Sequence, residues 1–128
     1  MERARRKLGA VALVVVAAAV GVVTGVASPA QASGKWCNNQ VCVESYDGGT
    51  YLGRLEVSVW TQNRPGRVNA RVWSTSGWSQ WTHTEDVGAF TTYRGWVYPQ
   101  QHFPSQTRIC VEGFQSDSSV GLPCFTIV

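Results

Sequence analysis

The fold is decided by residues 51–73, which read YLGRLEVSVWTQNRPGRVNARVW. Residues 51–61 and 67–73 alternate apolar and polar side chains, and this period of two is typical of half-buried β-strands. Pro65 and Gly66 between them suit the corner of a turn. Two such strands in succession predict a hairpin with one buried face and one polar face.

The alternation also predicts which side chains form the core. One face of the two strands is aliphatic and comprises Leu55, Val57, Val59, Val68, Ala70 and Val72. The opposite face carries Trp60 on the first strand, and Asn69, Arg71 and Trp73 on the second. If the two strands pair, Trp60 comes near Arg71 or Asn69, and Trp73 comes near Ser58 or Glu56. A Trp60 ring on Arg71 would make a cation–π contact.

Outward from this stretch, short β-rich runs alternate with clusters of Gly, Pro, Asn, Asp and Ser. We expect further strands at 40–46, 79–84, 89–98, 107–114 and 123–128, with the polar run 79–84 at a sheet edge. The proline-bearing segment 99–106 is expected to be a loop, and 115–121 a polar tip. About seven short strands predict an all-β antiparallel sandwich of the immunoglobulin-like kind, with a small β-barrel as the alternative.

Residues 1–32 have the pattern of a secretory signal peptide. A basic segment, MERARRKLG, precedes the apolar run AVALVVVAAAVGVVTGVA, and Ala30 and Ala32 form an A-x-A cleavage site. Cleavage after Ala32 would leave one secreted, extracellular domain, residues 33–128. The alternative is an uncleaved membrane anchor, because an apolar run of about 20 residues can span a bilayer.

All four cysteines, Cys37, Cys42, Cys110 and Cys124, lie after the leader. An even count in a short exported chain predicts two disulfides, and four cysteines allow three pairings. We favour Cys37–Cys42 with Cys110–Cys124, because each pair can close a local loop. A zinc site is the alternative, although these spacings do not match the usual zinc pairs.

The charge distribution bears on the partner. The chain has a formal net charge of +3, but the excess comes from Arg3, Arg5, Arg6 and Lys7 in the leader, set against Glu2. Residues 33–128 carry as many Lys and Arg as Asp and Glu. Nucleic acids and anionic membrane surfaces require clustered basic side chains, so neither is expected as a partner.

The tryptophan-rich segment WSTSGWSQWTH, residues 73–83, is the strongest functional signal. Flat rings among polar side chains suit a ligand with apolar faces and hydroxyl edges, and binding hot spots use the same mixture. The alternative is a structural role, with the rings covered by loops or stacked on neighbouring side chains. The candidate ligand-binding residues are Trp60, Trp73, Trp78, Trp81, Asn69, Arg71 and Gln80.

Catalytic motifs are not evident, and we expect no enzyme, no catalytic residues, no metal ion and no cofactor. His83 and Glu85 in WTHTED would share one face of a strand, where a surface pair is the preferred interpretation over a metal or acid–base site. His102 is expected to face solvent. The acids of residues 33–128 are scattered, and they are Glu44, Asp47, Glu56, Glu85, Asp86, Glu112 and Asp117.

The Ala/Val-rich leader and the stretches WCNNQVCV, LEVSVW, RICVEGF and PCFTIV resemble those of a largely uncharacterised group of small secreted actinomycete proteins. That group shares two cysteine pairs and a tryptophan-rich all-β domain. The resemblance implies export and an all-β fold, and it carries no activity and no catalytic residues to this chain.

Three hypotheses follow for function. The first is a secreted, non-catalytic protein whose exposed tryptophans bind a polysaccharide or another extracellular ligand. The second is an inhibitor or antagonist of an extracellular protein, of the protease-inhibitor class, which presents loop 99–106 or the tip around Asp117. The third is a surface or assembly protein without a small ligand.

Overall fold

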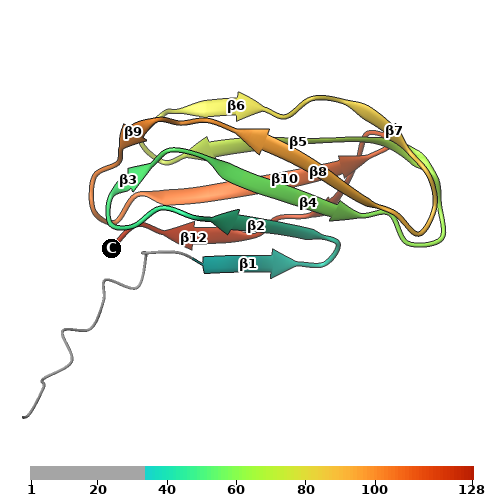
Figure 1. The fold of residues 1–128 in the computed structure, drawn as a ribbon, viewed down its shortest axis with the longest axis horizontal. Coiled ribbons are helices and arrows are strands. Elements are labelled where there is room, and N and C mark those ends of the chain that lie inside the picture. Colours follow the sequence, from blue (N-terminus) through green and yellow to red (C-terminus); the bar gives the residue numbers. More distant parts are fainter. Residues whose placement is uncertain (1–33) are drawn as a thin grey trace, which may run out of the picture.

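The computed structural model describes residues 34–128, so the predicted leader and its cleavage site lie outside the described residues. The described part is an antiparallel all-β domain (Figure 1). Its strands are β1 (Gly34–Asn38), β2 (Val41–Ser45), β3 (Tyr51–Leu52), β4 (Leu55–Trp60), β5 (Gly66–Ser74), β6 (Ser79–Trp81), β7 (Glu85–Val87), β8 (Thr92–Val97), β9 (Gln101–His102), β10 (Arg108–Gln115), β11 (Ser118–Gly121) and β12 (Cys124–Thr126). No helix that could cross a membrane is found among these residues.

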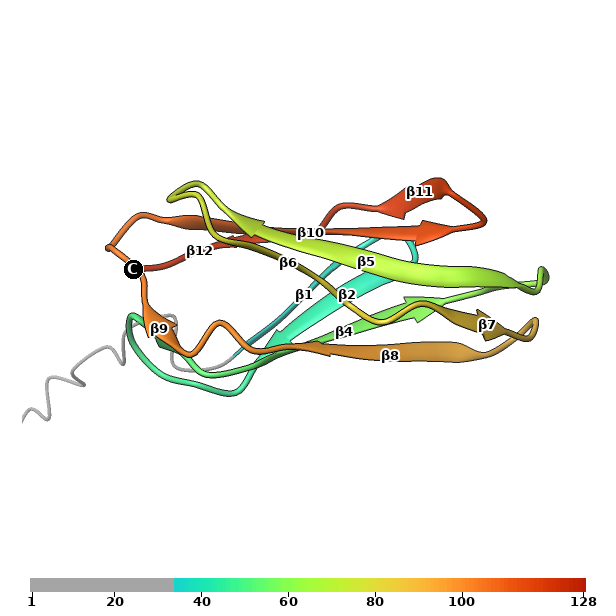
Figure 2. The same ribbon diagram turned by 90° about the horizontal axis from the view of Figure 1, so that it is seen from above.

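Two open sheets stack face to face, as Figure 2 shows. The four-stranded sheet has the order β1-β2-β4-β8. The six-stranded sheet centres on the pair β10-β5, and each of its edges is split between two short strands. β11 and β12 share the outer edge of β10, whereas β6 and β7 share the outer edge of β5. A small pair, β3-β9, forms a separate two-stranded sheet.

The predicted hairpin between residues 51–61 and 67–73 is wrong. β4 pairs with β2 and β8, whereas β5 pairs with β10, β6 and β7, so the two strands belong to different sheets. The loop between them crosses from one sheet to the other (Figure 2). Alternation sets which face of a strand is buried, and it contains no information on which neighbour supplies the hydrogen bonds.

The predicted core is confirmed. Leu55, Val57 and Val59 on β4 and Val68, Ala70 and Val72 on β5 are all 0% exposed. They face inward from opposite sheets and meet other aliphatic and aromatic side chains between them. Glycines allow the closest approach of the layers, because a Cβ at Gly113 on β10 would overlap Val41 on β2.

The immunoglobulin-like sandwich is likewise confirmed by the strand pairing. β4 pairs with β8 in one sheet and β5 with β10 in the other, as strands B–E and C–F do in that architecture. Residues 34–128 form twelve strands rather than about seven, because β1, β7, β9 and β11 are additional and residues 51–60 divide into β3 and β4. Segment 99–106 also contains a short strand, β9, although it was expected to be only a loop.

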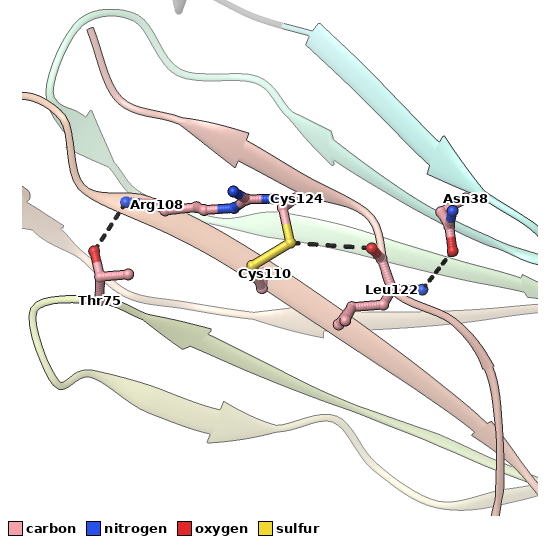
Figure 3. Close-up of a disulfide and its surroundings, with 6 residues drawn as sticks. All are labelled: Asn38, Thr75, Arg108, Cys110, Leu122 and Cys124. Atoms are coloured by element: carbon pink, nitrogen blue, oxygen red, sulfur yellow. Dashed lines mark hydrogen bonds between the residues drawn. A yellow bond between two sulfur atoms is a disulfide. The ribbon is translucent and has the colours of Figure 1, made fainter.

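Both predicted disulfides are confirmed. Cys37–Cys42 joins directly opposite residues of β1 and β2, and Cys110–Cys124 does the same for β10 and β12. Figure 3 shows the second disulfide between its two strands. Near it, the Arg108 amide donates to Thr75 Oγ1 (3.0 Å), and the Leu122 amide donates to Asn38 Oδ1 (2.9 Å). Each bridge therefore fastens a short edge strand within its own sheet.

Candidate functional site

The outer face of the six-stranded sheet carries a contiguous group of aromatic side chains. Trp73 lies on β5, Trp81 on the edge strand β6, and Phe114 on β10. The rings of Trp81 and Phe114 have centroids 5.8 Å apart, so they meet above the strand that separates them. The Arg71 guanidinium carbon lies 5.6 Å from the Trp73 ring centroid, and Arg71 is the register partner of Trp81. We call Trp73, Arg71, Trp81 and Phe114 the aromatic strip.

The outward orientation of the aromatic strip follows from the alternation of side chains along a β-strand, which has a period of two residues. Arg71 and Trp73 are outward because Val68, Ala70 and Val72 face the core, and their register partners on β6 and β10 share that outward face. From the Asn69–Phe114 row to the Trp73 row, β5 rises by about 13 Å, so the strip is extended. Trp81 is its most accessible ring at 54% exposure, because β6 lies at the sheet edge.

Polar groups border the strip. Asn69 lies opposite Phe114, and its Nδ2 donates to Thr84 Oγ1 at 3.2 Å. Glu112 lies opposite Arg71, and it accepts a hydrogen bond of 3.1 Å from Ser119 Oγ. The Cys110–Cys124 disulfide closes the end of the face beside Trp73. Side-chain amide, guanidinium and carboxylate groups are therefore available around flat rings.

The structure brings four of the predicted ligand-binding residues together on this face, namely Trp73, Trp81, Asn69 and Arg71. Gln80 points the other way, because its register partner is the core residue Val72. The Gln80 Oε1 atom accepts a 3.1 Å hydrogen bond from the Tyr98 amide. Gln80 thus connects the edge of this sheet to the segment after β8.

Trp60 and Trp78 also lie away from the strip. Trp60 is on the four-stranded sheet, 42% exposed, and its ring centroid is 6.5 Å from that of Phe90. The predicted contact of Trp60 with Arg71 is wrong, because these residues lie on different sheets. Trp78 is half-buried against the core, with its ring edge-on to Phe103 at 6.0 Å.

Two residues of the face, Phe114 and Glu112, were missed by the sequence reasoning. The alternation in RICVEGFQ was a usable signal, because Ile109, Val111 and Gly113 face inward and the residues between them face outward. Their pairing with β5 could not be inferred, since it depends on which strand lies beside β10.

A second aromatic cluster lies on the four-stranded sheet. The Arg54 guanidinium carbon is 5.3 Å from the Tyr46 ring centroid and 5.1 Å from that of Trp96. Beneath them the buried Glu56 pairs with Arg94. Partial desolvation, followed by the negative charges of Glu56 and Glu44, raises the pKa of the Tyr46 phenol. The cluster already contains its own cation, so its rings are partly covered by Arg54.

The two histidines make surface contacts. His83 Nε2 lies 3.1 Å from Glu85 Oε2, and both side chains are more than half exposed, as the preferred interpretation predicted. His102 is exposed, and its Nδ1 lies 3.0 Å from Thr50 Oγ1. Within residues 34–128, no three side chains of His, Cys, Asp or Glu gather closely enough to hold a metal ion.

The fold and the site together define a disulfide-stapled β-sandwich with an aromatic sheet face. No family model matches the chain, and no curated protein or solved structure is similar enough to count as a match.

Proposed function

We propose that the protein is a secreted, non-catalytic recognition protein that binds an extracellular polysaccharide through the aromatic strip. The observation that carries the proposal is the continuity of Trp73, Arg71, Trp81 and Phe114 on one outward sheet face. The two disulfides support an oxidising location, and the predicted leader and the likeness to small secreted actinomycete proteins agree with export.

The chemistry of the strip favours a sugar chain over a compact ligand. A pyranose ring has apolar C–H faces that stack on indole and phenyl rings, and hydroxyl edges that hydrogen-bond to polar side chains. The strip is extended by about 13 Å along β5, which suits successive units of a chain. Asn69 and Glu112 lie beside the rings, where they can bond to the hydroxyl edges.

Retention on a panel of insoluble and soluble glycans tests the proposal. Trp81→Ala removes the most exposed ring of the strip, and we expect a loss of about 2 kcal/mol, roughly 30-fold in Kd. Because Trp81 is 54% exposed on an edge strand, its removal should leave the thermal midpoint nearly unchanged. Affinity electrophoresis or depletion assays measure the loss.

Trp60→Ala is the matched control. It removes an exposed tryptophan of similar accessibility from the other sheet, so glycan binding should stay at the wild-type level. The proposal fails if the wild-type protein is retained on none of the glycans, or if Trp81→Ala binds as tightly as Trp60→Ala.

A second candidate function is inhibition of an extracellular protease. The observation that favours it is the hairpin β10-β11, whose exposed tip has Ser116 and Asp117 in left-handed conformation (φ 50° and 66°) within the segment that the Cys110–Cys124 bridge encloses. A rigid exposed tip is pre-organised for insertion into another protein. Tight 1:1 inhibition that disappears when the tip is shortened would support this function, and no inhibition across a protease panel would exclude it.

A further inference from the structure

A polar pocket of about 430 Å³ lies at one end of the sandwich, and none of the residues of the aromatic strip lines it. It is formed where the β1–β2 turn, the β4–β5 loop and the β10–β11 hairpin come together. Figure 2 shows the last two at the same end of the molecule, on the right. Four of the described residues that line it carry side-chain amides, three carry hydroxyls, and Arg64 carries the only charge among them.

Two hydrogen bonds to backbone carbonyl groups hold the walls of the pocket in place. Gln115 Nε2 donates to the Arg64 carbonyl oxygen at 2.8 Å, and the Ser116 amide donates to the Arg67 carbonyl oxygen at 2.8 Å. Gly66 allows this approach, because a Cβ there would lie 2.8 Å from Ser116 Oγ. The β4–β5 loop and the β10–β11 turn are therefore held together as one rim.

Gln40 is the residue of the pocket that has an unsatisfied hydrogen-bond acceptor. Its backbone is fully bonded, since its amide donates to Val120 O at 3.1 Å and its carbonyl accepts from the Trp60 amide at 2.9 Å. Its side-chain Oε1 is buried and has no hydrogen-bond partner among the described residues. Proteins generally avoid such an oxygen, because burying an unpaired acceptor is costly.

We propose that this pocket binds a single sugar ring, with the Gln40 amide turning to accept a hydrogen bond from a ring hydroxyl. Amides and hydroxyls both donate and accept, which matches a ring that carries several hydroxyl groups. Pro65 and Val120 supply apolar contact for the C–H face, and the volume is within the range of small-ligand sites. No carboxylate lies among the described lining residues, so a neutral or an acidic sugar is accepted.

Titration of the isotope-labelled protein with glucose and with glucuronic acid tests the proposal by NMR. We expect the backbone amide signals of residues 61–65 and 115–118 to shift with added sugar. Shifts with both sugars indicate recognition of the hydroxylated ring alone. Shifts with glucuronic acid only, lost in Arg64→Gln, indicate an acidic sugar. The absence of shifts with either sugar overturns the proposal.

Gln40→Met separates binding from structure. It keeps the length of the side chain and removes the unpaired amide, so we expect affinity for the sugar to fall about tenfold while the thermal midpoint stays equal or rises. Ser45→Ala is the matched control, because Ser45 Oγ is also buried without a partner but lies outside the pocket. It should leave the sugar affinity unchanged.

Two further results complete the test. If Gln40→Met binds sugar as tightly as the wild-type protein, or loses thermal stability without any change in affinity, Gln40 is only structural and the proposal is overturned. Trp81→Ala should retain the shifts of the pocket residues, because Trp81 is not among the residues that line the pocket. Failure of polysaccharide binding and failure of sugar binding in the pocket are thus distinguishable.

Discussion

At the scale of single residues, Tyr93 connects the two sheets through its phenol. The side chain is 1% exposed on β8, and its hydroxyl donates to the carbonyl oxygen of His83. The Thr82 hydroxyl lies 2.8 Å from the same phenol oxygen, and the Ala70 amide on β5 donates to Thr82 Oγ1 at 2.8 Å. Thr82 therefore bridges the interruption between β6 and β7, and Tyr93 fixes it from the opposite sheet.

The pKa of Tyr93 gives a prediction for alkaline pH. Burial, with a smaller contribution from the Glu85 charge, raises the pKa of the phenol above 10.0, against the lowering effect of the Thr82 hydrogen bond. A raised pKa in the folded state means that its stabilisation is complete below the unfolded value and is lost as pH rises through the folded pKa. Tyr93→Phe should cost about 1–2 kcal/mol at neutral pH and should lose less stability than the wild-type protein above pH 10.

Thermal unfolding followed by circular dichroism, from neutral pH to above pH 10, measures both effects. Tyr98→Phe is the control, because Tyr98 is 53% exposed and should leave the neutral-pH midpoint unchanged. If Tyr93→Phe loses as much stability above pH 10 as the wild-type protein does, the assigned role of the phenol is contradicted.

At the scale of elements, the sequence predicted the faces of the strands better than their partners. The inward residues of β4 and β5 were all correct, and so was the outward position of Trp60 and Trp73. Their expected pairing was wrong, because each strand finds its hydrogen bonds in a separate sheet. The aromatic strip needs side chains from three strands, so only the part on β5, Arg71 and Trp73, could be assembled from the sequence.

The burial of Gln80 and Trp78 also could not be predicted from the sequence. Gln80 follows the alternation of β6, but the polar residue faces inward because that edge lies over the segment after β8. Trp78 is half-buried because Phe103, from a distant loop, packs against it. In each case the deciding contact comes from a segment that no local pattern identifies.

At this scale, the two disulfides contribute unequally to the free energy of unfolding. Cys110 and Cys124 are 14 residues apart, and Cys37 and Cys42 are 5 apart. If loop closure in the unfolded chain dominates, replacing Cys110 and Cys124 by alanine costs about 3 kcal/mol of stability. Replacing Cys37 and Cys42 costs about 2 kcal/mol. The edge strands they fasten also meet, since Trp36 on β1 stacks on Phe125 of β12 with ring centroids 4.2 Å apart.

Urea unfolding of the two paired variants measures the difference. Because the strands are in contact, the quadruple variant should deviate from the sum of the two losses. A larger loss from the Cys37/Cys42 pair would show that strand packing, rather than loop length, sets the contribution of each bridge.

At the scale of the whole molecule, the faces of the sandwich have different chemistry. The outer face of the six-stranded sheet presents the aromatic strip, the four-stranded sheet carries the Tyr46–Arg54–Trp96 cluster, and one end holds the polar pocket. A rigid sandwich can therefore present separate surfaces without any of them disturbing the common core.

The charge balance of the described domain gives the last prediction. Residues 34–128 carry equal numbers of Lys and Arg and of Asp and Glu, so long-range attraction contributes little to binding. If the aromatic strip binds a neutral glycan by stacking, raising the salt from about 0.1 M to 1 M, where the Debye length falls from about 10 Å to 3 Å, should change Kd by less than about twofold. An anionic polymer held by arginines would instead dissociate steeply with salt. Binding isotherms on the same glycan across this range separate the two, and a steep salt dependence on a neutral glycan would contradict stacking as the source of affinity.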